Sequence, residues 1–261
     1  MSRPFLVSTD GAVRTISINS PPWNLMSMEF IDELENEIEV IARDRNIRAV
    51  LLTAEGDDNF SAGMDLKQLP NGIKNKGSAR AVFDQRLKVI KSIETMGKPW
   101  VVTLFGYCLG GGLELPLGCH FRLGATEGAK IGLPEMDLGV VPAWGGSARL
   151  TKLIGEQHAL DMILRSKKIS GPEAYRLGLV HEVWPISSLK TEGMKIAQKL
   201  ASQPAMAVQS MLDVIVGSQN KTLDELLENE KNAVQKNRES ADAKEGRRAF
   251  LEKRRPIFNQ D

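Results

Sequence analysis

Hydrophobic and polar residues follow two different periods in the first part of the chain. Residues 5–18 alternate around Asp10 and Gly11, a pattern typical of a β-hairpin. In residues 26–42 the apolar positions recur at helical spacing, at Met28, Ile31, Leu34, Ile38 and Ile41. The pattern therefore predicts a helix soon after the hairpin.

The next segments alternate between strand and helix patterns. The apolar runs 48–53 and 100–104 predict buried strands. Residues 56–63 are typical of a loop, and residues 82–96 predict a helix. An α/β arrangement is expected from this order.

Helical patterns dominate the second half of the chain. A short helix is expected from the glycines at 110–112 to Leu117, followed by a short strand at 121–123. From about residue 145 the pattern is mostly helical, with one strand-like break at 179–184. We therefore expect an α/β core with a helical C-terminal part.

Composition and charge narrow the class of protein. With 261 residues, 42% of them hydrophobic, the chain is long and apolar enough to bury a sizeable core. The net charge of +1 gives no strong field, so neither nucleic acid nor a membrane is expected as a partner. No signal peptide or long apolar run is visible, which leads us to expect a cytoplasmic enzyme or binding protein.

The cysteines and histidines do not indicate a metal centre or a disulfide framework. Cys108 and Cys119 are too few for such a framework, and buried thiols are expected. The histidines lack metal-ligand spacing. Cys108 has no evident activating partner in the sequence. Metal catalysis and a serine or cysteine triad are therefore set aside.

Residues 110–115, Gly-Gly-Gly-Leu-Glu-Leu, are the most informative stretch for chemistry. Glycines allow a backbone to approach a ligand closely, and N–H groups at a helix start favour an oxyanion. Glu114 lies among leucines and a proline, where burial would raise its pKa and suit proton transfer. With Glu135 as a second carboxylate, the pattern predicts acid/base chemistry on a carbonyl compound with an enolate-like transition state.

Each feature also has a purely structural interpretation. The glycines do not match Rossmann spacing, and three glycines alone more often mark tight helix packing. Glu114 is consistent with an acid that only pairs with a helix dipole, and Glu135 with an exposed acid at a helix start. Asp65 is consistent with a helix cap, and Trp144 with a core residue.

Taken in order, five segments resemble the enoyl-CoA hydratase/isomerase (crotonase) family, and the match covers almost the whole chain. They are residues 19–24 (NSPPWN), 60–66 (FSAGMDL), 106–115 (GYCLGGGLEL), 132–146 (GLPEMDLGVVPAWGG) and 249–254 (AFLEKR). No single segment is decisive, but five in the same order are highly specific.

The resemblance implies an α/β fold of the crotonase type, a spiral of repeated ββα units. Residues 1–195 would form the core with the active site. Residues 196–261 would form a helical region that joins subunits into a homotrimer or a dimer of trimers.

The resemblance also implies acyl-CoA thioesters as substrates. The thioester oxygen would accept hydrogen bonds from the backbone N–H groups of Met64 and Gly111. Glu114 and Glu135 would hold one water, one acting as base as the water oxygen joins C3 and the other helping to protonate C2. No metal or separate cofactor is implied, because coenzyme A is part of the substrate.

Further residues are implied to bind the acyl group or the CoA portion. Phe250 and Lys253 would reach CoA, including that of a neighbouring subunit, since a lysine suits a phosphate. The full set implied for CoA or substrate binding is Trp23, Ala62, Asp65, Leu66, Lys67, Gly110, Trp144, Phe250 and Lys253.

Some residues depart from the family pattern. His120 stands where aspartate is common, and the stretch around residues 126–128 is slightly longer. Met64 and Trp144 replace smaller residues, and Trp23 is bulky for its loop. Trp144 is expected to crowd the acyl pocket, which indicates a short, flat, cyclic or otherwise unusual acyl group.

An enoyl-CoA hydratase is the leading hypothesis. Other crotonase reactions stay open: double-bond isomerisation, dehydration of a specialised hydroxyacyl-CoA, or hydrolytic C–C cleavage. An isomerase typically needs only one acid, so the intact pair argues against it. A non-catalytic or RNA-binding protein on this fold is a third hypothesis, which the near-neutral charge weakens.

Overall fold

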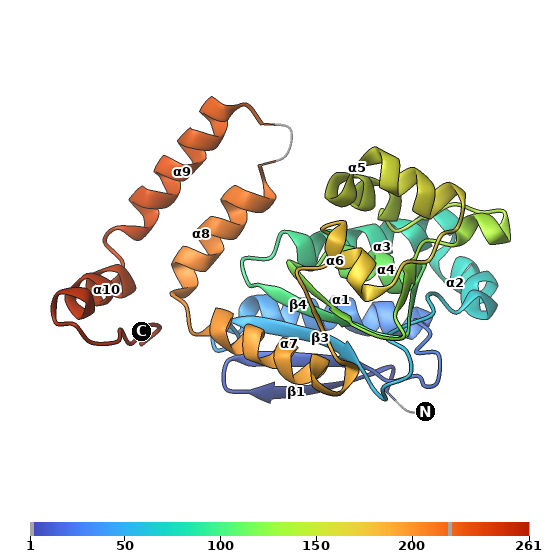
Figure 1. Ribbon diagram of the computed structural model, residues 1–261, viewed down its shortest axis with the longest axis horizontal. Helices are drawn as coiled ribbons and strands as arrows, with labels where there is room; N and C mark the ends of the chain where they lie inside the picture. The colour runs from blue at the N-terminus through green and yellow to red at the C-terminus, as the bar shows by residue number, and fades with distance from the viewer. Residues whose placement is uncertain (1–2, 219–220, 261) are drawn as a thin grey trace.

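A twisted six-stranded sheet forms the centre of the protein, in the order β1-β2-β3-β4-β6-β8. The computed structural model describes residues 3–218 and 221–260. The strands of this sheet are β1 (Phe5–Asp10), β2 (Val13–Ile18), β3 (Ala49–Ala54), β4 (Trp100–Leu104), β6 (Phe121–Ala125) and β8 (Glu182–Trp184). Figure 1 shows the sheet with helices around it.

The predicted hairpin and buried strands are confirmed. β1 and β2 pair antiparallel from Phe5 opposite Ile18 to Asp10 opposite Val13. The remaining neighbours, from β2–β3 to β6–β8, pair in parallel. All residues of β3 and β4 are buried, as their mostly apolar sequences predict for parallel strands.

A second, two-stranded sheet was not expected from the sequence. It joins β5 (Tyr107–Leu109) to β7 (Lys130–Gly132) in parallel. β5 ends directly before the glycines at 110–112, so this small sheet fixes the point from which the next helix starts.

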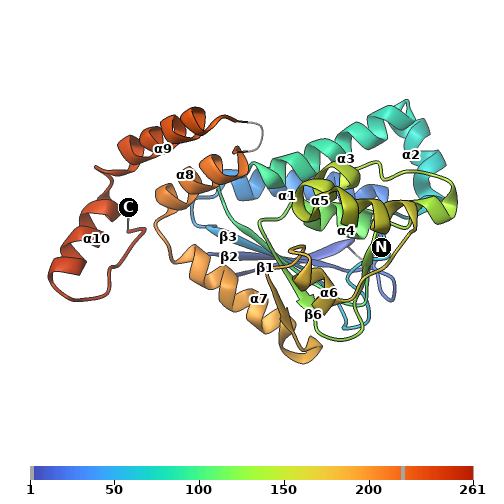
Figure 2. The ribbon, with the colours of Figure 1, turned by 45° about the horizontal axis from the view of Figure 1, so that its top comes forward.

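The helices lie on both sides of the main sheet. α1 begins after Ser27, whose side chain accepts a hydrogen bond from the Phe30 N–H, and Phe30 packs edge-on against Phe5 of β1. Figure 2 shows α1 and α3 on one side of the sheet and α7 on the other. The helices of the core are α1 (Met28–Arg43), α2 (Leu69–Lys76), α3 (Ala79–Glu94), α4 (Gly111–Leu117), α5 (Gly146–Leu164), α6 (Gly171–Arg176) and α7 (Ile186–Ala201).

The last helices project away from this core in both views (Figures 1 and 2). They are α8 (Ala205–Val216), α9 (Leu223–Asn237) and α10 (Ala241–Leu251). The expected boundary between residues 195 and 196 falls inside α7. The projecting part carries many exposed apolar side chains, namely Met206, Met211, Ile215, Leu223, Leu227, Val234, Phe250, Leu251 and Ile257. Across residues 3–218 and 221–260, no helix combines the length and the apolar character needed to cross a membrane.

Candidate active site

The glycine segment forms the start of α4. Gly110 precedes the helix with φ 54°, a left-handed conformation that glycine adopts without strain. A Cβ at Gly110 would lie only 3.2 Å from Oε1 of Glu135, so a side chain there would press on that carboxylate. The predicted helix from the glycines to Leu117 is confirmed.

The loop that contains Met64 runs beside this helix start. Ser61 pairs with Cys108, and the Leu109 N–H donates to the Ser61 carbonyl at 3.1 Å. A Cβ placed on Gly63 would lie 3.5 Å from the Gly111 nitrogen, which shows how closely the two segments approach. Within the described part of the chain, no acceptor takes the N–H of Met64 or of Gly111. Two adjacent backbone donors are thus available to an oxygen atom.

Glu114 lies on the first turns of α4 and is 2% exposed. Its Oε1 accepts two hydrogen bonds, from the Trp144 N–H at 2.7 Å and the Gly146 N–H at 2.9 Å. Burial raises the pKa of Glu114 to about 7, against the lowering effect of those two donors. The apolar environment predicted from the neighbouring leucines is therefore present, and a carboxyl with this pKa is able to give or take a proton near neutral pH.

Glu135 opens a short 3-10 helix, η2 (Glu135–Leu138), and turns its carboxylate inward. Its Oε1 faces Gly110, and its Oε2 is buried without a hydrogen-bond partner among the residues that the structure describes. Burial raises the pKa of Glu135, and its charge contributes to the raised pKa of Glu114. The interpretation of Glu135 as an exposed acid at a helix start is therefore wrong, and two interacting acids flank the helix start.

Trp144 lies against the same place from the other side. It is 2% exposed, and a Cβ on Gly111 would meet its ring at 2.6 Å from Cζ3. The guanidinium of Arg86, on α3, lies 5.4 Å from the centre of that ring. The interpretation of Trp144 as a core residue fits this burial, and the expectation that Trp144 crowds the acyl pocket stays a prediction.

Two arginines that the sequence did not single out support these groups. Arg149 donates to the Trp144 carbonyl at 3.1 Å and forms an ion pair with Glu94 at 3.0 Å, which holds the turn whose N–H groups bind Glu114. Arg86 is fully buried. Its spacing from Val82, Val89, Ile90 and Ile93 puts it on the buried face of α3, a signal that the sequence did contain.

The first loop is tied to the Met64 loop by hydrogen bonds. The Ala62 N–H donates to the Trp23 carbonyl at 2.9 Å, and the Ser61 hydroxyl donates to the Asn24 carbonyl at 2.7 Å. Trp23 is 49% exposed and stacks on Tyr107 at 5.7 Å between ring centres. The structure thus places Trp23 and Ala62 next to each other.

Asp65 caps a short 3-10 helix, η1 (Leu66–Gln68), as its structural interpretation predicted. Its carboxylate accepts from the Lys67 N–H at 3.1 Å and from the Gln68 side chain at 2.9 Å. Leu66 and Lys67 are exposed. These side chains therefore face solvent at one end of the Met64 loop.

Phe250 and Lys253 belong to the projecting part of the chain. Phe250, on α10, is 83% exposed, and Lys253 follows the end of that helix. Both ribbon views place α10 far from α4 in the described chain (Figures 1 and 2). One chain alone does not bring these two residues to the glutamates.

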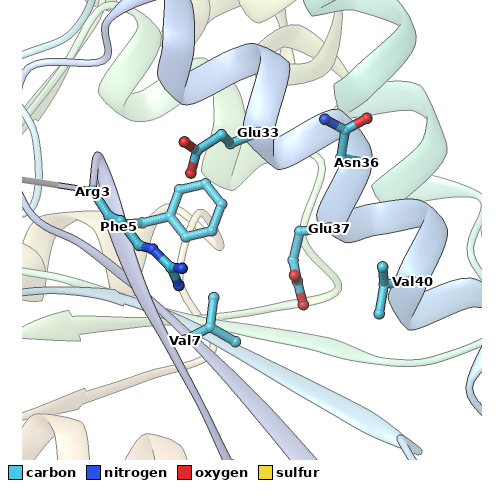
Figure 3. Close-up of a pocket in the computed structure, with 7 residues that line it drawn as sticks. All are labelled: Arg3, Phe5, Val7, Glu33, Asn36, Glu37 and Val40. Carbon is cyan, nitrogen blue, oxygen red and sulfur yellow. The ribbon is translucent and has the colours of Figure 1, made fainter.

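Other chemistry-bearing groups and the hollow at β1 give no second candidate site in the described chain. Burial raises the pKa of the Cys108 thiol, which keeps it protonated and unreactive. Among the described residues, no three His, Cys, Asp or Glu side chains gather in a way that could hold a metal ion. The hollow in Figure 3 lies between β1 and α1 and is lined by Arg3, Phe5, Val7, Glu33, Asn36, Glu37 and Val40.

Comparison with known proteins gives a consistent result. The family profile described as enoyl-CoA hydratase/isomerase matches residues 8–261. A probable enoyl-CoA hydratase of Bacillus subtilis is 34% identical over 257 residues, with 97% of each chain covered. A short-chain-enoyl-CoA hydratase of Clostridium acetobutylicum is 31% identical over 251 residues, covering 96% of this chain and 95% of that protein.

Solved structures show the same similarity in three dimensions. An enoyl-CoA hydratase from Bacillus anthracis superposes with a TM-score of 0.92 at 33% identity, over 99% of this chain and 100% of the other. A protein from Geobacillus kaustophilus, described as an enoyl-CoA hydratase, has a TM-score of 0.93 at 30% identity, over 100% and 98% of the two chains. The expected crotonase fold is thereby confirmed.

Proposed function

The chain belongs to the enoyl-CoA hydratase/isomerase family, and on that premise we propose that it adds water across the 2,3 double bond of a 2-enoyl-CoA thioester. The observation that carries this proposal is the pair of inward-turned acids, Glu114 and Glu135, beside two unoccupied backbone N–H groups. Crotonase-family enzymes act on acyl-CoA substrates, and addition of water to a conjugated thioester requires these two elements together.

The N–H groups of Met64 and Gly111 stabilise the enolate oxygen of the thioester. Negative charge grows on this oxygen as water adds to C3, so donors already in place act most strongly in the transition state. In the free protein neither group has an acceptor among the described residues, so no internal bond must break before the thioester binds.

Glu114 and Glu135 share the proton transfers. One carboxylate accepts a proton from the water as its oxygen bonds to C3. The other glutamate, in its protonated form, gives a proton to C2 as the enolate returns to the thioester. The Trp144 and Gly146 N–H groups fix Oε1 of Glu114, which leaves the Oε2 side of the carboxylate for the water. A pKa of about 7 supports Glu114 in both directions of transfer.

The remaining family-implied residues are assigned to the rest of the substrate. Ala62, Leu66 and Lys67 of the Met64 loop, and Trp23 of the first loop that bonds to Ala62, are assigned to the CoA portion. Asp65 acts there by holding the turn through its cap on η1. Phe250 and Lys253 would contact CoA only at a neighbouring subunit, within a homo-oligomer of cytoplasmic location.

A panel of 2-enoyl-CoA thioesters tests this proposal. Hydration removes the conjugated double bond, so absorbance falls and the product gains the mass of one water. We expect both changes for at least one thioester of the panel. Loss of conjugation without gain of water would instead indicate double-bond isomerisation.

A further inference from the structure

Arg86 is a buried cation with few partners. Its side chain on α3 is fully buried. One guanidinium nitrogen, Nη1, donates to the Val82 carbonyl of its own helix at 2.7 Å. The other, Nη2, donates at 3.0 Å to the Met28 sulfur, a weak acceptor. Nε is buried and has no partner within residues 3–218 and 221–260.

The charge of Arg86 is not balanced inside the protein. No carboxylate of the described chain forms an ion pair with it. Asp32, the acid that acts on it through space, is already bound to Lys76 at 2.8 Å and to Gln85 at 2.8 Å. Burial lowers the pKa of Arg86 only to about 10, so the group remains a cation at neutral pH.

Packing against Trp144 does not replace a counter-ion. A cation over a ring recovers part of the desolvation penalty, but less than removing an ion from water requires. The ring also gives Nε no hydrogen-bond acceptor. Buried charges are normally paired, so an arginine in this state indicates a missing anionic partner.

The place of Arg86 indicates where that partner comes from. On one side Arg86 contacts the Met28 sulfur. Met28 follows Met26 by two residues, and Met26 pairs with Met64. On its other side lies Trp144, whose ring rests against Gly111. The guanidinium thus lies between the Met28 sulfur and the Trp144 ring, and that ring rests against Gly111, one of the two proposed oxyanion donors.

We propose that Arg86 recognises a carboxylate at the far end of the acyl group, so that the substrate is a 2-enoyl-CoA with an anionic tail. The proposal rests on the proposed function and names its substrate class. The carboxylate takes the place of the Met28 sulfur and binds the guanidinium through two N–H···O bonds, the geometry that suits arginine. Met28 is only half-buried and unbranched, so it can turn aside toward solvent.

Matched ligands test this proposal without any variant. Enoyl-CoA thioesters ending in a carboxylate, at several chain lengths, are compared with their methyl esters, which keep the shape and lose the charge. We expect the carboxylate to be preferred at one length by at least roughly ten-fold in kcat/KM, because a desolvated charge pair is worth that much. The saturated thioesters are compared in the same way for Kd, which needs no turnover.

The variants Arg86→Met and Arg86→Lys then assign the preference to this residue. Arg86→Met should abolish the preference, so that the carboxylate and its methyl ester bind this variant with equal Kd. Arg86→Lys should retain part of the carboxylate preference, because lysine keeps the positive charge but lacks the two parallel N–H groups of the guanidinium. Arg122→Met is the matched control, since Arg122 is 4% exposed and bonded to the Leu179 and Cys119 carbonyls, and it should keep the preference.

Two results would overturn the proposal. One is equal Kd for carboxylate and ester at every length. The other is an Arg86→Met variant that weakens both ligands alike, which would make Arg86 only a support for Trp144. Binding preference without hydration of any thioester would instead reject the proposed function and keep the carboxylate site, so the two failures are distinguishable.

Discussion

The backbone N–H of Trp144 donates a 2.7 Å hydrogen bond to Oε1 of Glu114. This bond connects the turn before α5 to the buried acid on α4. Arg149 donates to the Trp144 carbonyl and so stabilises the same turn. One residue therefore positions the carboxylate through its backbone and covers Gly111 through its ring. Trp144 therefore couples the orientation of the Glu114 carboxylate to the packing over Gly111.

Stability should fall as Glu114 ionises. Burial raises its pKa to about 7 from an ordinary 4.5, so the folded state holds the proton more tightly than the unfolded chain. The stabilising contribution of Glu114 to the free energy of unfolding is complete below pH 4.5 and is lost as pH rises through 7. It amounts to about 3 kcal/mol.

The variant Glu114→Gln cannot ionise and should escape this loss. We expect the free energy of unfolding of the variant, relative to that of the wild type, to rise from pH 5 to pH 8. Denaturant unfolding at each pH measures both values. Glu156→Gln, at an exposed position, is the control and should show no such trend. A difference between Glu114→Gln and wild type that is the same at both pH values would contradict the assignment.

Substitutions at Gly111 and Trp144 should have non-additive effects on kcat, because the two residues are in contact. In Gly111→Ala the new methyl group would meet the Trp144 ring at 2.6 Å, which displaces one of the two proposed donors. Loss of such a donor lowers kcat by roughly a hundred-fold or more. Adding Trp144→Ala relieves the clash and should restore part of the rate, so a double-mutant cycle should not be additive. Additive losses would mean that the two groups do not meet.

Trp144 should also set acyl preference. Because the ring is 2% exposed, Trp144→Ala is expected to lower the unfolding free energy by roughly 3–5 kcal/mol. It should at the same time shift the ratio of kcat/KM toward longer linear enoyl-CoAs, since the ring occupies space beside Gly111. A uniform loss across chain lengths, with the same drop in stability, would leave Trp144 a core residue only.

The C-terminal helices are expected to join subunits. α8 to α10 carry many exposed apolar side chains in one chain, and α10, which contains Phe250, lies far from α4 (Figure 1). Light scattering should give a mass of three or six times 28.8 kDa. Truncation after Glu245 should weaken CoA-ester binding. A fully active monomer would refute this expectation.

Several parts of this structure follow from the sequence because local pattern and burial agree. The apolar spacing in residues 26–42 reproduces α1 to within a few residues, with Ser27 as its cap. β4 is apolar except for Thr103 and is wholly buried. The leucines around Glu114 correctly predict that this acid is buried.

Other parts depend on contacts between distant segments. β5 is only three residues long, and its pairing with β7 is set by the tertiary fold. α2 contains Gly72, a weak helix former, and Gly72 is held by close packing on Met28. The inward turn of Glu135 likewise depends on the close approach of Gly110, which no local pattern reveals.

The most direct test of the proposed chemistry is the hydration rate of Glu114→Gln and Glu135→Gln. A glutamine keeps the shape of each side chain and removes its proton transfer. We expect each variant to lower kcat by at least roughly a hundred-fold, with CoA-ester binding largely kept. Near-normal hydration by Glu135→Gln would contradict the two-acid mechanism and favour double-bond isomerisation.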